Sequence, residues 1–303
     1  MKFEVLILGN SSATPMYERH PTSQLLNVNE QYYLIDCGEG TQMQLARFGV
    51  KATRINHIFI SHLHGDHYLG LMGLLSSQNL MGRKTDLHLY GPAPLLEILT
   101  LQFKYSDTTL RYQLLFHATD AAHEELLLRN NSIEVHSFPL RHRVPCTGFR
   151  FEEVPQPASL NVEAVSKLNI PKAFYSLLKK GFDYESPAGQ IYAAKDLTTP
   201  APATRSYAFC SDTIRFPDYL ASIKAVDLLY HESTFLHDMV DRARETFHTT
   251  SREAAEIAIE VQAKRLLLGH FSARYKDLTP LLEEAQSIFP ETVLSEEGKW
   301  FLI

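Results

Sequence analysis

Cysteine is scarce in this chain, and long apolar runs are missing from it. The three cysteines among 303 residues, Cys37, Cys146 and Cys210, lie far apart and include no C-x-x-C pair. An odd, scattered set argues against a disulfide framework and favours a reducing, cytoplasmic compartment. No apolar run reaches the roughly 18 residues of a membrane span, and the segment 1–8 is too short and too acidic for a signal peptide. We therefore expect a cytoplasmic protein without membrane association.

An excess of positive charge is also missing. The formal net charge is −6, so any binding of nucleic acid must use a local basic patch rather than the field of the whole molecule. Apolar residues make up 45% of the chain and charged residues 21%, as in an ordinary globular protein large enough for one big domain or two modest ones. Histidine is abundant, with 14 copies.

Short strand-like segments followed by helical patterns run through the chain. Strands are predicted at Phe3–Leu8, Ser23–Val28 and Tyr32–Ile35, and a helix begins near Thr41. A continuous helical segment is predicted from Tyr68 to Leu80. A second, similar half begins near Tyr207 and contains an amphipathic helix at Thr250–Ala263. This order predicts a mixed α/β fold in two similar halves rather than regular βαβ units.

The stretch from about residue 153 to 199 has a different composition. Prolines interrupt it, and it carries five lysines: Lys167, Lys172, Lys179, Lys180 and Lys195. Long segments of this kind inside compact domains are usually functional or disordered. We predict a protruding, partly helical arm, with a long ordinary loop as the alternative.

The densest group of metal-binding side chains follows the apolar strand Ile55–Ile60. His62, His64, Asp66 and His67 lie within six residues, around a turn that contains Gly65. Imidazole suits zinc, and an added carboxylate keeps the ion hard enough to bind water and phosphate oxygens. The alternative is a polar loop with solvent-facing histidines, which requires this spacing to arise by chance.

Three further side chains with metal-binding chemistry lie just past other predicted strands: His142, Asp212 and His270. Singly, each is more often a turn or cap residue than a ligand. Together with the dense group they predict two zinc sites. One holds His62, His64 and His142; the other holds Asp66, His67 and His270; Asp212 bridges them. Two such ions would acidify a shared water and hold a phosphodiester for in-line attack.

Several motifs narrow the interpretation. They are Asp36–Gln42, Ser61–Gly70, Ser211–Thr213, His231–Thr234, His248–Thr250 followed by Glu253–Ala255, and Gly269–Tyr275. Their combination resembles the ribonuclease Z family, the tRNA 3′-processing endonucleases of the metallo-β-lactamase superfamily. The resemblance implies a four-layer αββα sandwich of two mixed β-sheets flanked by helices, forming a single domain over residues 1–303 with the arm inserted. It also implies two zinc ions per chain, precursor tRNA as substrate and, at this short length, a homodimer.

The same resemblance implies catalytic roles. Asp66 matches the aspartate that accepts a proton from the attacking water. His248 matches a histidine that protonates the leaving 3′-oxygen, and Glu232 matches the carboxylate that orients it; a structural hydrogen bond is the alternative for this pair. Arg274 is expected to meet a phosphate, with a surface ion pair as the alternative.

Two places depart from the family pattern. The loop Pro15–His20 has Tyr17 in place of the usual lysine and His20 in place of asparagine, while Arg19 is kept. Tyr17 can stack on a base at the unpaired 3′ end. The arm keeps Lys172, Lys179 and Lys180 for phosphate contacts but lacks the Gly-Pro elements of its tip.

Three functions are therefore compared. The first is a zinc phosphodiesterase that removes the 3′ trailer of precursor tRNA by attack of a dizinc-activated hydroxide. The second is a dizinc phosphodiesterase of the same fold that acts on small phosphodiesters and has a vestigial arm. The third is an RNA-binding protein that has lost catalysis, which the complete set of predicted ligands and Asp66 argue against.

Overall fold

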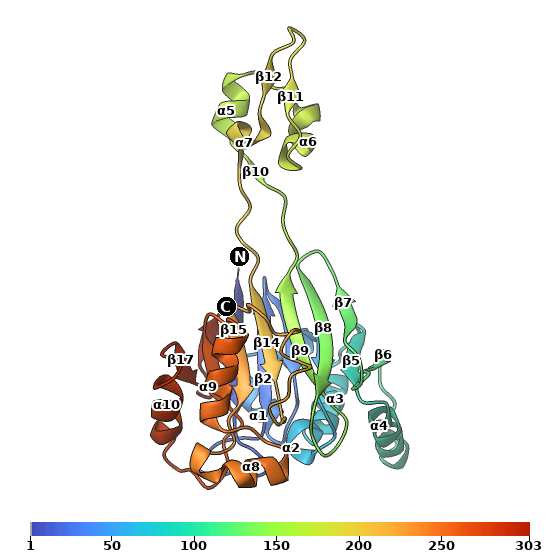
Figure 1. Ribbon diagram of the computed structural model, residues 1–303. Coiled ribbons are helices and arrows are strands. Elements are labelled where there is room, and N and C mark those ends of the chain that lie inside the picture. Colours follow the sequence, from blue (N-terminus) through green and yellow to red (C-terminus); the bar gives the residue numbers. More distant parts are fainter. Residues whose placement is uncertain (1) are drawn as a thin grey trace. The chain divides into compact units, whose positions relative to one another are not determined.

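The computed structural model describes residues 2–303, which divide into two compact units. The chain up to Glu152 together with Arg205–Ile303 forms the larger unit, here called the body, and Glu153–Thr204 forms the smaller one. Each is described separately below, with the element labels of Figure 1.

The first sheet of the body has seven strands in the order β18-β1-β2-β3-β4-β5-β6. Strands β18, β1, β2 and β3 are antiparallel neighbours, whereas β3, β4, β5 and β6 run parallel. Its strands are β1 (Phe3–Gly9), β2 (Ser23–Val28), β3 (Gln31–Ile35), β4 (Ile55–Phe59), β5 (Leu87–Gly91), β6 (Leu114–Ala118) and β18 (Trp300–Leu302).

The second sheet also has seven strands, in the order β17-β16-β15-β14-β9-β8-β7. Strands β14 to β17 are parallel, and β9 pairs antiparallel with β14. Its strands are β7 (Glu125–Arg129), β8 (Ile133–Leu140), β9 (Cys146–Glu153), β14 (Ser206–Cys210), β15 (Leu228–Glu232), β16 (Leu266–Gly269) and β17 (Thr292–Leu294). Both sheets are therefore mixed.

The two sheets pack face to face through an apolar layer. Phe59 and Tyr90 of the first sheet belong to the same buried cluster as Phe149, Phe209 and Tyr230 of the second. Alternation along each strand sends the intervening residues to the outer faces. Burial of this layer is the main stabilising contribution that joins the two sheets.

Helices cover the outer face of each sheet, as Figure 1 shows. Leucines of α1, α3 and α4 pack on the first sheet, and the alanine-rich side of α9 packs with α10 on the second. The predicted αββα sandwich is therefore confirmed. The helices of the body are α1 (Thr41–Arg47), α2 (Gly65–Tyr68), α3 (Leu71–Leu80), α4 (Pro94–Tyr105), α8 (Val240–Thr246), α9 (Ser251–Glu260) and α10 (Thr279–Gln286), with single 3-10 turns at Ala52–Arg54 and His237–Met239.

The smaller unit has a core of its own. Val165, Ile170, Leu178 and Tyr184 are buried together with Ala194 and Leu197. Its elements are β10 (Ser159–Leu160), α5 (Val162–Lys167), a 3-10 turn at Lys172–Phe174, α6 (Tyr175–Lys179), β11 (Tyr184–Glu185), β12 (Ile191–Tyr192), α7 (Ala194–Leu197) and β13 (Thr198–Thr199). This unit spans the segment predicted as the arm and is called the arm below.

The sequence-based expectations need two corrections. The helix expected from Tyr68 to Leu80 is two helices, α2 and α3, separated at Leu69–Gly70. Strand β9, helix α8 and strand β17 were not predicted. Within residues 2–303 no helix is long and apolar enough to cross a bilayer.

Candidate metal centre

The predicted ligands follow the ends of four strands. His62, His64, Asp66 and His67 lie between β4 and the end of α2, and His142 follows β8. Asp212 follows β14, and His270 follows β16. Because β14 and β16 both run parallel to β15, the last two residues lie at the same edge of the second sheet. The two sheets thus contribute ligands to one place in the body.

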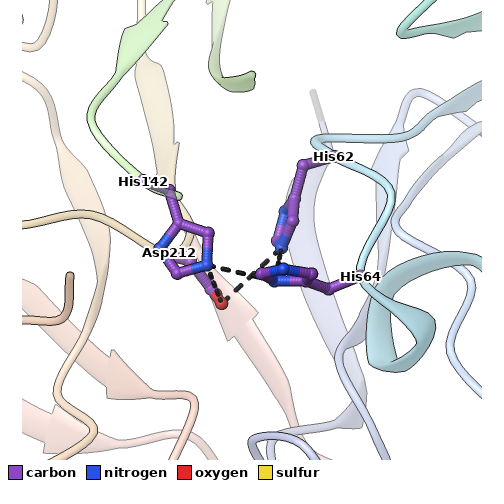
Figure 2. Close-up of side chains that lie close together, drawn as sticks. All are labelled: His62, His64, His142 and Asp212. Atoms are coloured by element: carbon purple, nitrogen blue, oxygen red, sulfur yellow. Dashed lines mark hydrogen bonds and ion pairs between the residues drawn. The ribbon is translucent and has the colours of Figure 1, made fainter. Parts of the chain in front are cut away.

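Three imidazoles and a carboxylate form the first cluster, shown in Figure 2. His64 Nδ1 lies 3.1 Å from His62 Nε2 and 3.0 Å from His142 Nε2. Asp212 Oδ2 lies 3.6 Å from the Nε2 atoms of both His62 and His142. Four donor atoms from three separate segments therefore point at one another.

Asp66, His67 and His270 form the second cluster. Asp66 Oδ2 lies 3.4 Å from His67 Nε2 and 3.5 Å from His270 Nε2. The other oxygen of Asp212, Oδ1, lies 3.3 Å from His67 Nε2 and 3.1 Å from His270 Nε2. Asp212 thus presents one oxygen to each cluster, the arrangement expected of a bridging carboxylate.

This geometry fits metal ions. Donors about 2.0–2.1 Å from a tetrahedral ion lie roughly 3.3–3.4 Å apart, close to the spacings within both clusters. The Nε2 atoms of His67 and His270 are buried without a hydrogen-bond partner. A buried polar atom of this kind carries a free-energy cost that a bound ion would remove. The donor set of imidazoles and carboxylates suits zinc and related divalent ions.

Hydrogen bonds to Nδ1 leave Nε2 of four histidines facing the clusters. His67 Nδ1 lies 2.7 Å from Asp36 Oδ2, and His62 Nδ1 lies 3.0 Å from Ser61 Oγ. His142 Nδ1 lies 3.1 Å from the carbonyl oxygen of Phe247, and His270 Nδ1 lies 2.9 Å from Thr234 Oγ1. Such partners fix the tautomer and the ring orientation of a ligand.

Asp36 is a supporting residue that sequence reasoning missed. Its buried carboxylate accepts hydrogen bonds from the backbone N–H of Ser61 at 2.8 Å and from Ser61 Oγ at 2.9 Å, in addition to its contact with His67. The motif Asp36–Gln42 was recognised from the sequence, but the partner of Asp36 lies 31 residues away. Only the strand pairing of β3 with β4 brings the two together.

Burial keeps the histidines of the first cluster uncharged. It lowers the pKa of His142 to about 4 and that of His62 well below its usual value. His67 behaves differently: burial lowers its pKa, but the charges of Asp212, Asp66 and Asp36 raise it well above the usual value. The second cluster therefore has an excess of negative charge that a cation would balance.

Glu232 and His248 form a charged pair beside the clusters. His248 Nδ1 lies 2.9 Å from Glu232 Oε1, which also accepts from the backbone N–H of Thr213 and Thr249. Burial lowers the pKa of His248, but the charge and the hydrogen bond of Glu232 outweigh this effect and raise the pKa to about 9. The His248 ring lies 5.2 Å from that of His142 and 5.3 Å from that of His270, so it borders both clusters.

A close backbone contact positions the loop of Asp66. A Cβ atom at Gly70 would lie 2.1 Å from the carbonyl oxygen of Gly38, and one at Gly38 would lie 2.5 Å from that of Asp66. Gly70 N–H also donates to the carbonyl oxygen of Cys37 at 2.9 Å. Glycine at these two positions therefore allows the approach of α3 to the segment that carries Asp36.

The clusters open into a cavity of about 330 Å³. Its charged lining consists of Glu39, Asp66, Asp212 and Arg143, with His64, His142, His248 and His270 beside them. The side chain of Asp66 is 10% exposed, and its Oδ2 also accepts from the backbone N–H of Ala13 at 2.7 Å. The cavity therefore gives a substrate access to the clusters.

The predicted substrate-binding residues of the body lie outside the lining of this cavity. Arg19 donates to the carbonyl oxygens of Ser272 and Tyr275, so it holds together two loops. Tyr17 is 45% exposed and lies beneath the Arg19 guanidinium. Arg274 is exposed.

In the arm, Lys179 and Lys180 line a shallow basic pocket with Lys195, a residue not assigned a role from the sequence. Lys172 is exposed in a 3-10 turn.

Comparisons with known proteins place this architecture in a family. A protein from Bacteroides fragilis named ribonuclease Z is 44% identical over 297 residues, which cover 98% of both chains. One from Porphyromonas gingivalis with the same name is 46% identical over 295 residues, 97% of both chains. The family model described as anti-Pycsar protein Apyc1 matches residues 3–153.

Solved structures give the same result for the fold. The human tRNase Z, short form, superposes with a TM-score of 0.73 at 27% identity and covers 99% of both chains. The metallo-beta-lactamase fold protein YhfI from Bacillus subtilis has a TM-score of 0.70 at 19% identity, with the same coverage. With relatives above 40% identity along nearly its whole length, the chain belongs to the ribonuclease Z family.

Proposed function

We propose that this protein is an endoribonuclease that removes the 3′ trailer from precursor tRNA. The observation that carries the proposal is the convergence of seven ligand-type side chains from both sheets in a chain whose relatives named ribonuclease Z match it almost from end to end. The match to ribonuclease Z of Bacteroides fragilis includes the arm. The match to the anti-Pycsar protein Apyc1 model ends at residue 153, before the arm.

We further propose two zinc ions as the resident cofactors. His62, His64 and His142 would hold one, Asp66, His67 and His270 the other, and Asp212 would contact both. Bound zinc supplies Lewis-acid stabilisation of a phosphodiester and lowers the pKa of water towards neutrality. The hydrogen bonds of Asp36, Ser61 and Thr234 keep the imidazoles oriented for this role.

Two side chains are suited to move protons. The Asp66 carboxylate is accessible from the cavity, and the surrounding histidines hold its pKa well below the usual range in spite of burial, so it is ionised and able to accept a proton. His248 carries a proton at neutral pH because Glu232 stabilises its charged form. It lines the same cavity, from which it would donate to the leaving 3′-oxygen.

The arm is electrically neutral, with five lysines and five acidic residues, whereas the body carries the whole net charge of −6. Within the arm, Lys179, Lys180 and Lys195 line one pocket, which makes a local basic patch. Lysine contacts to tRNA phosphates would add affinity without reading sequence. We assign the arm to binding of precursor tRNA.

A homodimer in the cytoplasm completes the proposal. The cysteines are free and buried, as expected for a reducing compartment. Met43 on α1 and Leu80 on α3 are 72% and 80% exposed, on helices joined by the hydrogen bond from Gln42 to Ser77. We propose that these two exposed side chains lie in the interface with a second copy. Light scattering should give twice the chain mass, and a monomer that remains fully active would contradict this part of the proposal.

The test of function compares two substrates. The zinc-loaded protein should cleave precursor tRNA at micromolar enzyme and also hydrolyse bis(p-nitrophenyl) phosphate, and a chelator should abolish both activities. Hydrolysis of the small ester without cleavage of precursor tRNA would favour the small-phosphodiester function with a vestigial arm. RNA binding without either activity would mean that catalysis has been lost.

A further inference from the structure

We propose that Arg143 binds the substrate phosphate adjacent to the cleaved bond and so acts as a positioning residue for RNA. This inference rests on the proposed function. Nothing in the sequence motifs assigned a role to Arg143, which directly follows the candidate ligand His142.

Arg143 is the single lysine or arginine among the described residues that line the catalytic cavity. The remaining charged lining comprises Glu39, Asp66 and Asp212, together with the histidines. Asp66 and Asp212 belong to the metal clusters, so bound cations would balance their charge. Beyond the clusters, Glu39 would repel the polyanion, and Arg143 is the group able to attract it.

The Arg143 guanidinium is available for such a contact. The residue is exposed, and within residues 2–303 its side chain has no hydrogen bond, ion pair or ring contact. Many other arginines of the body are occupied: Arg19 binds backbone carbonyls, Arg215 pairs with Glu256 and Glu260, and Arg141 lies 4.7 Å from the ring of Phe216. An unpaired arginine in an otherwise acidic cavity is the pattern expected of an anion contact.

The backbone around Arg143 is fixed before any substrate binds. The Arg141 N–H donates to Thr213 Oγ1 at 3.1 Å, and the Ile214 N–H donates to the Arg141 carbonyl oxygen at 3.1 Å. The His142 side chain is fixed to Phe247. Ordering a segment in advance reduces the entropy lost on binding. Arg143 is thus held beside the clusters while its side chain remains free.

The position of Arg143 identifies which phosphate it meets. Arg143 directly follows His142 and lines the same cavity as His64 and Asp212, but it belongs to neither cluster. The cleaved phosphate must reach the donor atoms of the two clusters, which converge on Asp212. Because Arg143 lines this cavity outside both clusters, the phosphate that it would bind is one next to the phosphate held at the clusters.

The test uses Arg143→Ala, Arg143→Lys and the matched control Arg111→Ala, an exposed arginine that does not line the cavity. For precursor tRNA, Arg143→Ala should raise KM about tenfold, leave kcat within about twofold and reduce the salt dependence of binding by about one phosphate contact. Arg143→Lys should recover most of the loss because it keeps the charge. Hydrolysis of bis(p-nitrophenyl) phosphate, which has no second phosphate, should fall far less than cleavage of precursor tRNA in Arg143→Ala and should be unchanged in Arg111→Ala.

Two results would overturn the inference while the proposed function stands. In the first, Arg143→Ala cleaves precursor tRNA as well as Arg111→Ala does. In the second, Arg143→Ala loses as much activity on the small ester as on RNA. A fall in zinc content or melting temperature of Arg143→Ala would instead assign the residue a structural role. A wild-type protein that cleaves the small ester but no precursor tRNA would overturn the proposed function, and the inference with it.

Discussion

Glu232 and Asp66 are both largely buried acids, but they differ in their hydrogen-bond partners. Glu232 has five hydrogen bonds, from His248, from the backbone N–H groups of Thr213, Thr249 and Thr234 and from the Thr234 hydroxyl, so its carboxylate is fully satisfied without a metal ion. Asp66 has one backbone donor, and its Oδ2 faces two imidazoles at the clusters. The two acids are therefore suited to different tasks: Asp66 at the metal centre, Glu232 in support of His248.

Replacing Asp66 and His248 separates these tasks. Asp66→Ala should lower cleavage of both substrates at least about 100-fold and also weaken one metal site, because it removes the proposed proton acceptor and one of the proposed ligands. His248→Ala should lower turnover of precursor tRNA while zinc stays near two per chain. Elemental analysis and steady-state kinetics on both variants measure this, with the exposed Asp86→Ala as control.

Loss of a zinc ion from the His248 variant would contradict its role as a proton donor. That outcome has a structural basis, since His248 can form a ligand group with Asp212 and His270. His248 would then be a metal ligand, and another group would have to donate the proton to the departing 3′-oxygen.

The clustering of the ligand-type residues was predictable because four of them are dense in one short segment and the other three each come just after a strand. Asp36, Thr234 and Arg143 were not assigned roles, for a physical reason. Their partners are set by strand pairing and loop packing between segments far apart in the sequence, as with Asp36 and His67. A single residue type carries no signal of a contact that only the tertiary structure creates.

A histidine stack distant from the metal centre should make stability depend on pH. His57 is stacked between Tyr33 at 5.3 Å and His88 at 4.9 Å. Burial, followed by the positive charge of His88 and His117, lowers its pKa from 6.5 to about 4. Between these two values the unfolded chain binds a proton here that the folded chain does not. The free energy of unfolding should therefore fall as pH falls through this window, by about 2 kcal/mol at pH 5.

Thermal melting of the wild type and of His57→Gln at pH 7.5 and pH 5 measures this effect. The glutamine variant should lose less stability between the two pH values than the wild type. His136→Gln, on β8, controls for removal of a histidine elsewhere in the body. An equal pH dependence in the wild type and His57→Gln would show that the stack does not carry the effect.

At the scale of elements, the break between α2 and α3 has a clear cause. Gly70 lies against the backbone of Gly38, and this approach ends one helix and begins the next. The apolar pattern from Tyr68 to Leu80 predicted one helix because periodicity reports the buried face and not a contact of backbone with backbone. Strand β9 was missed for a related reason: it lies between two strands of its sheet and is mostly buried, so its pattern does not alternate clearly.

Gly70→Ala tests the contact against Gly73→Ala, a control in the helix that follows. The added Cβ would lie 2.1 Å from the Gly38 carbonyl oxygen, so the variant should lose about 1–3 kcal/mol of stability. Its activity should fall more steeply because Gly38 contacts the backbone of Asp66. Gly73→Ala places its Cβ in ordinary contact at 3.6 Å and should be neutral or stabilising, because alanine favours helix. If denaturant unfolding gave equal stability for the two variants, the contact between Gly70 and Gly38 would not be what positions Asp66.

At the scale of the molecule, the chain combines a metal-binding body with a small unit inserted between two strands of one sheet. The arm leaves the body after β9 and returns at β14, and Ser206 pairs directly with Glu152 across these antiparallel strands. The ends of the insertion are therefore neighbours within the sheet. The arm also has a core of its own, and the buried clusters of the body contain none of its residues.

Replacing residues 154–204 with Asn-Gly should therefore leave the body folded, because a two-residue turn closes adjacent antiparallel strands. The shortened protein should bind two zinc ions and hydrolyse bis(p-nitrophenyl) phosphate at a rate close to that of the full chain. Its kcat/KM for precursor tRNA should fall at least about tenfold, because the lysines of the arm and their phosphate contacts are gone. A full chain in which Lys179, Lys180 and Lys195 are changed to alanine is the matched control and should show part of the same loss. Equal loss of both activities in the shortened protein, with zinc retained, would mean that the arm supports catalysis in the body rather than binding of tRNA.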